Sequence, residues 1–252
     1  NRFKMLRSKY PDSSLTPEVM WWLGEYYYRH NELGLARRYF SSLIRDFPGS
    51  NLIADAYYAL GSSFEEESRF DEAIDNLNKA LGLGKSDLAG QATIAIADIY
   101  VKQNKPDLAL IKYKECAQEY ANLAGLIYPK IAELYYKRSE YSEALDFFRK
   151  ALEAAALKDM AVIQIKIAEV LEAQGKSDEA VEEYLKVTYL FAENSAQAVK
   201  ALLRVAQIYE GKENFKEALN IYKRILSLNT EESKYAQERI DWINLHTDKR
   251  RM

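Results

Sequence analysis

The amino-acid sequence predicts an all-α protein, an α-solenoid in which antiparallel helix pairs stack side by side. Two observations carry this prediction. Apolar residues recur with helical spacing, and one pattern of small and large residues occurs six times along the 252 residues. The composition agrees, because 10 Gly and 5 Pro are too few for the turns of a many-stranded β protein.

The repeated pattern consists of a small residue, an alanine twelve residues later, and an aromatic residue or leucine four residues after that. The six small residues lie 35 to 38 positions apart and are Gly24, Gly61, Ala97, Ala132, Ala168 and Ala206. The six alanines are Ala36, Ala73, Ala109, Ala144, Ala180 and Ala218. The large residues are Phe40, Leu77, Tyr113, Phe148, Tyr184 and Tyr222. Small residues on both helices of a pair would let the two helices approach closely.

Each repeat divides into two amphipathic helices at a short polar break, such as Lys102–Lys105 in the third repeat. Proline or acidic residues follow the breaks, as expected where a second helix begins. The expected repeats are 17–53, 54–89, 90–124, 125–160, 161–198 and 199–230. Because each pair has apolar surface on both flanks, it has to stack on its neighbours.

The pattern continues at both ends of the chain, which begins with Asn1 and is expected to be part of a longer protein. Tyr10-Pro11 parallels Phe47-Pro48, so residues 1–12 are expected to be the second helix of a truncated repeat. Residues 231–245 are expected to form a capping helix, with Tyr235, Ala236, Ile240 and Ile243 on one face and charged residues on the other. A basic tail, 246–252, follows.

Charge is distributed unevenly along the sequence. Residues 1–10 carry four basic residues and no acid, and 246–252 carry three basic residues and one acid. Because the net charge is −3 overall, the body of the chain between these two ends carries −9. An acidic body of this kind argues against a general nucleic-acid-binding surface. No apolar run approaches the length of about 18–20 residues that a membrane span needs, so direct membrane insertion by this segment is not expected.

The sequence predicts no catalytic, cofactor-binding or metal-binding residues, and hence a protein that is not an enzyme. His30 and His246 stand apart from other candidate catalytic residues, and the single cysteine, Cys116, occupies a packing position of a second helix. Gly82–Ser86 lacks the full spacing of a phosphate-binding loop and follows a predicted helix, not a strand.

The order of Leu23, Gly24, Tyr27, Ala36, Phe40 and Pro48 resembles the tetratricopeptide repeat family, and the resemblance extends over essentially the whole chain. It implies a right-handed superhelix with a concave face. The repeats are slightly longer than is usual in the family, and the family's leading tryptophan is missing. Residues 10–64 resemble bacterial envelope proteins of the outer-membrane assembly (BamD-like) and Tol-associated (CpoB-like) kinds. This finer resemblance favours a bacterial protein at the periplasm or outer-membrane periphery.

The resemblance also implies where a partner would bind, because in this family the first helices line the concave face. The candidate partner-binding residues at those positions are Trp21, Glu25, Tyr28, Tyr58, Ser62, Asp98, Glu133, Tyr136 and Glu169. Some members clamp a peptide carboxylate with an asparagine on this face. The six equivalent positions here are Glu25, Ser62, Asp98, Glu133, Glu169 and Gln207. Four of the six are acidic, so a basic or mixed apolar segment of a protein or peptide is expected in place of a carboxylate terminus.

Several alternatives stay open at this stage. The leading hypothesis is a non-catalytic interaction scaffold, with no cofactor, that binds a partner segment in the groove. The array could instead be a structural or oligomerisation module of an envelope assembly, which self-associates through its N-terminal edge, or a regulatory array attached to a catalytic domain outside this sequence. Trp21, Tyr28 and Tyr58 are candidates either for partner anchors or for inter-helix packing. Pro129 either lies in the opening turn of its helix or kinks the helix.

Overall fold

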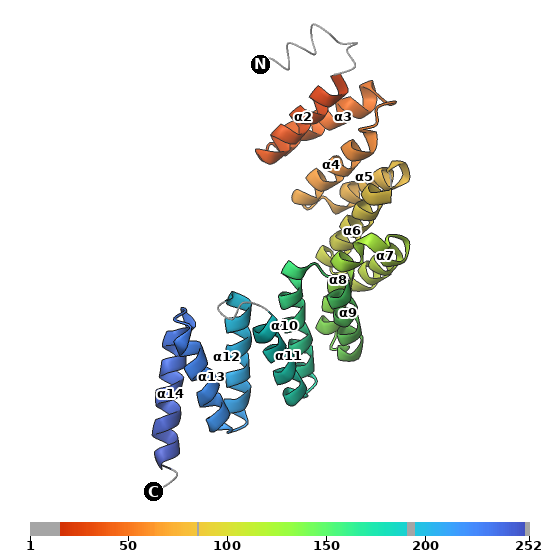
Figure 1. The fold of residues 1–252 in the computed structure, drawn as a ribbon. Helices are drawn as coiled ribbons and strands as arrows, with labels where there is room; N and C mark the ends of the chain where they lie inside the picture. The colour runs from red at the N-terminus through yellow and green to blue at the C-terminus, as the bar shows by residue number, and fades with distance from the viewer. Residues whose placement is uncertain (1–15, 85, 191–194, 250–252) are drawn as a thin grey trace. The chain divides into compact units, whose positions relative to one another are not determined.

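A computed structural model describes residues 16–84, 86–190 and 195–249. Within these residues there are thirteen α-helices and one short 3-10 helix, joined by turns, and no strand (Figure 1). The predicted helix at residues 1–12 lies outside the described residues. The helix bounds in chain order are α2 Thr16–Arg29, α3 Leu33–Asp46, α4 Ile53–Glu66, α5 Phe70–Leu83, α6 Ser86–Lys102 and α7 Pro106–Glu119, then the 3-10 helix η1 Ala121–Leu123. They continue with α8 Ala124–Lys137, α9 Tyr141–Ala154, α10 Leu157–Ala173, α11 Ser177–Leu190, α12 Ala196–Gly211, α13 Phe215–Ser227 and α14 Glu232–Lys249.

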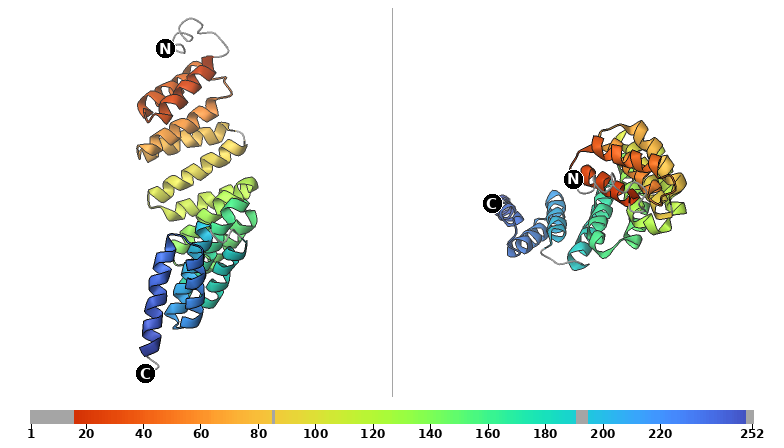
Figure 2. Two further views of the ribbon diagram at one scale, coloured as in Figure 1. Left: turned by 60° about the vertical axis from the view of Figure 1, so that its left-hand side comes forward. Right: turned by 90° about the horizontal axis from the view of Figure 1, so that it is seen from above.

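The chain divides into two compact units. Unit 1 ends at Leu123 and unit 2 begins at Ala124. In unit 1, α2 packs on α3, α4 on α5 and α6 on α7, and each hairpin packs on the next one through α3 with α4 and α5 with α6 (Figure 2). Unit 2 repeats this arrangement with α8 and α9, α10 and α11, and α12 and α13, and α14 closes it by packing on α13. The fold is therefore an α-solenoid of stacked helix pairs, as the sequence predicts.

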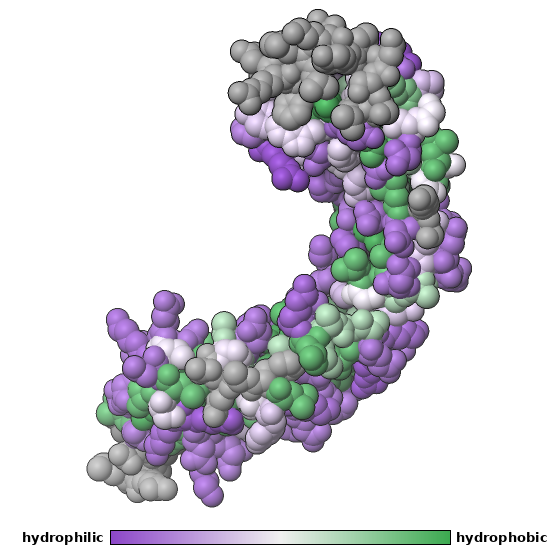
Figure 3. Space-filling model, turned by 45° about the horizontal axis from the view of Figure 1, so that its top comes forward, coloured by the Kyte–Doolittle hydropathy of each residue, from purple (hydrophilic) through white to green (hydrophobic). Residues whose placement is uncertain are grey.

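The repeated residues form the core of both units. All six alanines of the second helices have no exposed surface, and the six large residues that follow them are at most 2% exposed. The small residues of the first helices, from Gly24 to Ala206, are buried as well. Hydrophilic side chains cover most of the surface that Figure 3 shows, and hydrophobic side chains appear between them. No helix in the described part of the chain is long and apolar enough to span a membrane.

The two glycines of the pattern are required by close contact between paired helices. A Cβ atom added at Gly24 would lie 2.4 Å from Cε1 of Phe40, and one at Gly61 would lie 2.7 Å from Cγ of Leu77. Such distances are shorter than van der Waals contact. Helix α2 therefore lies this close to α3, and α4 to α5, only because these positions have no side chain.

The turns between paired helices repeat with the same period as the core. Each turn holds one residue with positive φ, namely Asn31, Ser68, Asn104, Ser139, Gly175 and Glu213. The next backbone N–H then donates back to the carbonyl five residues earlier, as Glu140 N does to Tyr135 O at 3.0 Å and Lys176 N to Leu171 O at 2.9 Å. These bonds satisfy helix-end carbonyls, so the left-handed residue ends each first helix.

The sequence left two places open for Pro129. It lies inside α8, five residues beyond the first residue of the helix, and not in the opening turn.

Two details of the last helix differ from the sequence-based expectation. On α14, Ala236, Ile240 and Ile243 are buried as expected, but Tyr235 is 40% exposed and forms an edge contact with Tyr222 at 6.4 Å between ring centroids. The helix also continues to Lys249, past residue 245. Periodicity placed Tyr235 on the apolar face of the helix, but only Ala236, Ile240 and Ile243 of that face belong to the buried cluster, and Tyr235 contacts it from the side.

The first prediction tests the glycine contact. We expect Gly24→Ala to lower the free energy of unfolding by about 1–3 kcal/mol, because the new methyl group would displace the Phe40 ring. Gly82→Ala on α5 is the control. No atom lies within 4 Å of a Cβ at that position, so the alanine should be neutral or stabilise by up to about 1 kcal/mol. Urea denaturation measures the free energy of unfolding of both variants. An equal change in Gly24→Ala and Gly82→Ala would contradict the close-contact explanation.

A second prediction concerns the left-handed turn residues in two successive repeats. Ser139 has φ 61° and Gly175 has φ 77° at equivalent positions. A Cβ atom is unfavourable in this conformation, so Ser139→Gly should stabilise unit 2 and Gly175→Ser should destabilise it, each by about 1 kcal/mol. Thermal and urea unfolding of the two variants measure the opposite shifts. A loss of stability in Ser139→Gly would show that the turn depends on the serine side chain.

Candidate binding groove

In unit 1, the candidate residues of α2 and α4 lie side by side because their helices pack on one core cluster. Met20, Phe40 and Leu60 are buried in this cluster, and Trp21 and Tyr28 pack against it while staying partly exposed. Trp21, Glu25 and Tyr28 are four and three residues apart, so they share one face of α2. The first helix of the next repeat, α6, contacts α4 directly.

Carboxylates surround the hydroxyl groups of the two tyrosines on this surface. Burial, followed by the negative charges of Glu66, Glu65 and Glu25, raises the pKa of Tyr28. Burial and the charges of Glu65 and Asp98 raise the pKa of Tyr58. Both tyrosines are therefore neutral at physiological pH. The acids that act on Tyr28 come from α2 and α4, and those that act on Tyr58 come from α4 and α6.

Basic side chains compensate only part of this negative charge. Lys102 donates to Glu65 at 2.8 Å, and this hydrogen bond raises the pKa of the lysine. Arg29 lies 3.5 Å from Glu25, with its own side chain 78% exposed. We name the surface formed by Glu25, Tyr28, Tyr58, Glu65, Glu66 and Asp98 the acidic tyrosine surface.

Two other candidates in unit 1 have structural contacts that the sequence did not reveal. The Trp21 ring packs on the buried Phe40 ring, with 5.3 Å between centroids, so its substitution would also disturb the core. The Ser62 hydroxyl donates to the Tyr58 carbonyl at 3.2 Å within its own helix. Tyr28 and Tyr58 are therefore better probes of binding than Trp21.

A tyrosine from the second helix reaches a groove carboxylate in three repeats. Tyr113 donates to Asp98, Tyr184 to Glu172 at 3.2 Å, and Tyr222 to Glu210 at 2.8 Å. Burial and the neighbouring carboxylate raise the pKa of each of these tyrosines. The rings are buried in the hairpin core, so these hydrogen bonds link the core directly to the acids on the first helices.

In unit 2, the candidate acids are paired with basic residues of the following repeat. Lys166 lies 3.0 Å from both Glu133 and Glu169, and Lys200 lies 3.3 Å from Glu169. Arg204 pairs with Glu172 and Arg239 with Glu210. Burial lowers the pKa of Lys166, but its hydrogen bonds to Glu169 and Glu133 outweigh burial and raise it. Glu133, Glu169, Glu172 and Glu210 on the first helices of unit 2 are thus each paired with a basic residue of the protein.

Two of these ion pairs, Glu169 with Lys200 and Glu172 with Arg204, line a cavity of about 530 Å³ in unit 2. Two of the candidates, Tyr136 and Glu169, line it together, and so do Tyr184, Lys200 and Arg204. Lys166, Arg204 and Tyr184 are not among the residues that the sequence predicts for partner binding. The available signal was the spacing, because Lys166 and Arg204 each follow their acidic partner by nearly the length of one repeat.

The tyrosine–carboxylate pairs predict a pH dependence of stability. An unfolded tyrosine has a pKa of about 10, and the buried ones are raised above it. Below about pH 10 the folded and the unfolded protein both keep the phenol proton, so the tyrosines leave the free energy of unfolding unchanged with pH. Above it the unfolded state releases protons first, so the free energy of unfolding falls as the pH rises.

We therefore expect Tyr222→Phe to reduce the loss of stability above about pH 10, at a cost of about 1 kcal/mol near neutral pH from the lost hydrogen bond. The double variant with Tyr113→Phe should reduce it further. Phe148 holds the equivalent position in the fourth repeat, so the ring itself fits there. Urea denaturation as a function of pH is the measurement, and an unchanged slope in the double variant would contradict this account.

The comparisons with known proteins agree with this architecture. Three family models described as tetratricopeptide repeat match residues 18–50, 58–124 and 159–231. No curated protein sequence matches the chain.

Solved structures give the same fold at low sequence identity. The C-terminal part of a TPR repeat-containing protein from Cytophaga hutchinsonii is similar with a TM-score of 0.76 and 17% identity, over 93% of this chain and 92% of that chain. BtubC from P. vanneervenii has a TM-score of 0.62 and 16% identity, over 75% and 86%. MamA has a TM-score of 0.58 and 16% identity, over 72% and 95%. The three matched segments together span more than half of the chain, and the stacked hairpins have the architecture that the matches predict. The chain belongs to the tetratricopeptide repeat family.

Proposed function

We propose that this chain is a non-catalytic scaffold and that the acidic tyrosine surface of unit 1 binds a partner segment carrying basic and apolar side chains. Tetratricopeptide repeats are generally protein-interaction scaffolds. The observation that carries the proposal is the field around Tyr28 and Tyr58, in which Glu25, Glu65, Glu66 and Asp98 act together.

The chemistry of this surface suits a lysine or arginine next to an apolar residue. The tyrosine rings offer apolar area with a hydroxyl that can donate or accept, and aromatic residues of this kind are favoured anchors in interfaces. The carboxylates would pair with the cation, and Glu66 is exposed and in none of the ion pairs within the described residues. An incoming carboxylate would be repelled at the same place.

The candidate residues of unit 2 offer a different surface. Glu133, Tyr136 and Glu169 lie beside Lys166 and Lys200, so positive and negative groups alternate there. This surface suits a polar segment of mixed charge. Basic residues of a partner gain less binding free energy there because the acids are already paired within the protein. A role in the bacterial cell envelope remains a prediction from the resemblance of residues 10–64.

The test uses a short fluorescein-labelled peptide that alternates lysine and leucine, with binding followed by fluorescence anisotropy. We expect Glu25→Lys combined with Glu66→Lys to weaken binding by about tenfold or more, because both acids lie in the field around Tyr28. Asp75→Lys combined with Glu115→Lys is the matched control. It makes the same change in charge at exposed positions of α5 and α7.

Circular dichroism establishes that both double variants keep their helices. The affinity of the control variant for the peptide should fall by at most about twofold, because only the net charge of the protein changes. Equal weakening in the two double variants, or no binding to the native protein, would exclude the acidic tyrosine surface as the binding site.

A further inference from the structure

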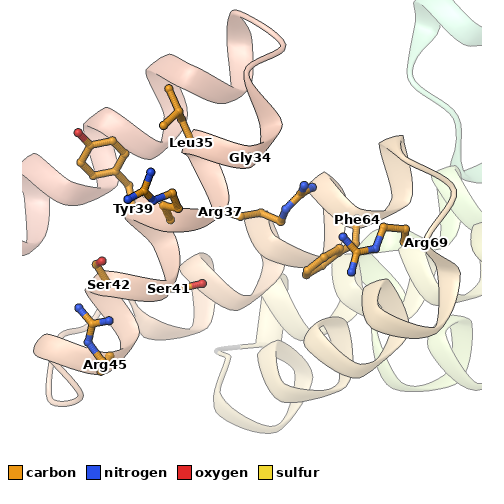
Figure 4. Close-up of a pocket in the computed structure, with 10 residues that line it drawn as sticks. Gly34, Leu35, Arg37, Tyr39, Ser41, Ser42, Arg45, Phe64 and Arg69 are labelled. Carbon is orange, nitrogen blue, oxygen red and sulfur yellow. The ribbon is translucent and has the colours of Figure 1, made fainter.

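Unit 1 has a second surface whose charge is opposite to that of the acidic tyrosine surface. A cavity of about 790 Å³ is formed by α3 together with the α4–α5 hairpin, and its lining includes Arg37, Arg38, Arg45 and Arg69 (Figure 4). Between residues 16 and 84 the basic residues are Arg29, Arg37, Arg38, Arg45, Arg69 and Lys79, so four of these six line one cavity. No carboxylate is among the ten lining residues.

Two of the arginines are held in place by the protein itself. The guanidinium carbons of Arg37 and Arg69 lie 4.8 Å and 4.5 Å from the centroid of the Phe64 ring. Glu67 binds Arg37 at 2.9 Å and lies 3.7 Å from Arg69, and the hydrogen bond from Arg37 lowers the pKa of this carboxyl group. Arg37 also donates to the Ser63 carbonyl at 3.1 Å, and its side chain is only 17% exposed.

The other two arginines are exposed. Arg38 makes no ion pair with any residue that the structure describes, whereas Arg45 donates to both carboxylate oxygens of its neighbour Asp46, at 2.7 and 3.1 Å. They are seven residues apart on α3, which places them about 10 Å apart along one face of the helix. Ser41, Ser42 and Tyr39 add hydroxyl groups to the same cavity. Two arginines held in place, an unpaired Arg38 and an exposed Arg45, with hydroxyl donors beside them, favour an anionic ligand.

We infer that this cavity, named here the arginine cavity, binds an acidic segment of a protein partner. A segment in the polyproline II conformation advances about 3.1 Å per residue with three residues per turn, so carboxylates three residues apart lie on one side and would match the spacing of Arg38 and Arg45. The volume is in the range of sites that enclose a ligand of several residues. A long polyanion fits less well, because Glu32, Glu66 and Glu67 line the depression next to it and would repel a continuing phosphate backbone.

This binding is independent of the acidic tyrosine surface. The arginine cavity is built on α3, the second helix of its hairpin, and shares no lining residue with the candidates on α2, α4 and α6. The two surfaces would select partner segments of opposite charge.

The experiment measures anisotropy of a short fluorescein-labelled peptide that carries glutamates three residues apart, at physiological salt and with the full chain. We expect Arg38→Glu combined with Arg45→Glu to weaken its binding by about tenfold or more. Arg38→Gln combined with Arg45→Gln should weaken it less and tests the loss of charge without repulsion. Arg149→Glu combined with Lys223→Glu, at exposed positions of α9 and α13, is the matched control and should have little effect.

Four further measurements decide the class of ligand. The acidic surface variant, Glu25→Lys with Glu66→Lys, should bind the glutamate peptide at least as well as the native protein, which separates this inference from the proposed function. A peptide with glutamine in place of glutamate should not bind. Equal weakening in the α3 variant and its matched control would overturn the inference. Tighter binding of a single-stranded oligonucleotide, or displacement of the peptide by millimolar inorganic phosphate, would also overturn it.

Discussion

Each hairpin depends on one contact, in which a small residue of the first helix meets a large residue of the second. At Gly24 and Gly61 this contact leaves no space for a methyl group, and in the later repeats alanine occupies the same buried position. The contact sets how closely the helices pack, and the rest follows from it. Closely packed helices keep each turn short, which requires a left-handed residue, and they expose flat flanks on which the next hairpin stacks.

The same regular stacking organises the charges. Residues about one repeat apart lie on neighbouring first helices, so a base can meet an acid from the repeat before it, as Lys102 meets Glu65 and Arg204 meets Glu172. Buried tyrosines add a hydrogen bond from the core to some of these acids. Exposed ion pairs contribute little to stability individually, so their main effect here is on the character of the surface. Unit 2 pairs the acids Glu133, Glu169, Glu172 and Glu210 of its first helices in this way, whereas unit 1 gathers more acids than bases around two tyrosines.

Unit 1 therefore separates its charges between two surfaces. The first helices carry acids around half-buried tyrosines, and α3 carries three of the six basic residues between positions 16 and 84. A helical repeat can do this because its first and second helices face different sides, while the core between them uses only small and apolar residues. The two surfaces can then change in sequence independently of the fold, since none of their charged residues belongs to the buried pattern.

The sequence by itself determined the fold of stacked helix pairs and the buried positions, because a nearly constant repeat period with fixed internal spacing specifies local packing. It also located Glu25, Tyr28 and Tyr58 on the first helices. Only the tertiary structure decided which acids are neutralised, that Trp21 packs on Phe40, that Tyr235 is exposed, and that four arginines meet in one cavity. These features depend on distances between side chains of different helices, which a pattern along one chain does not contain.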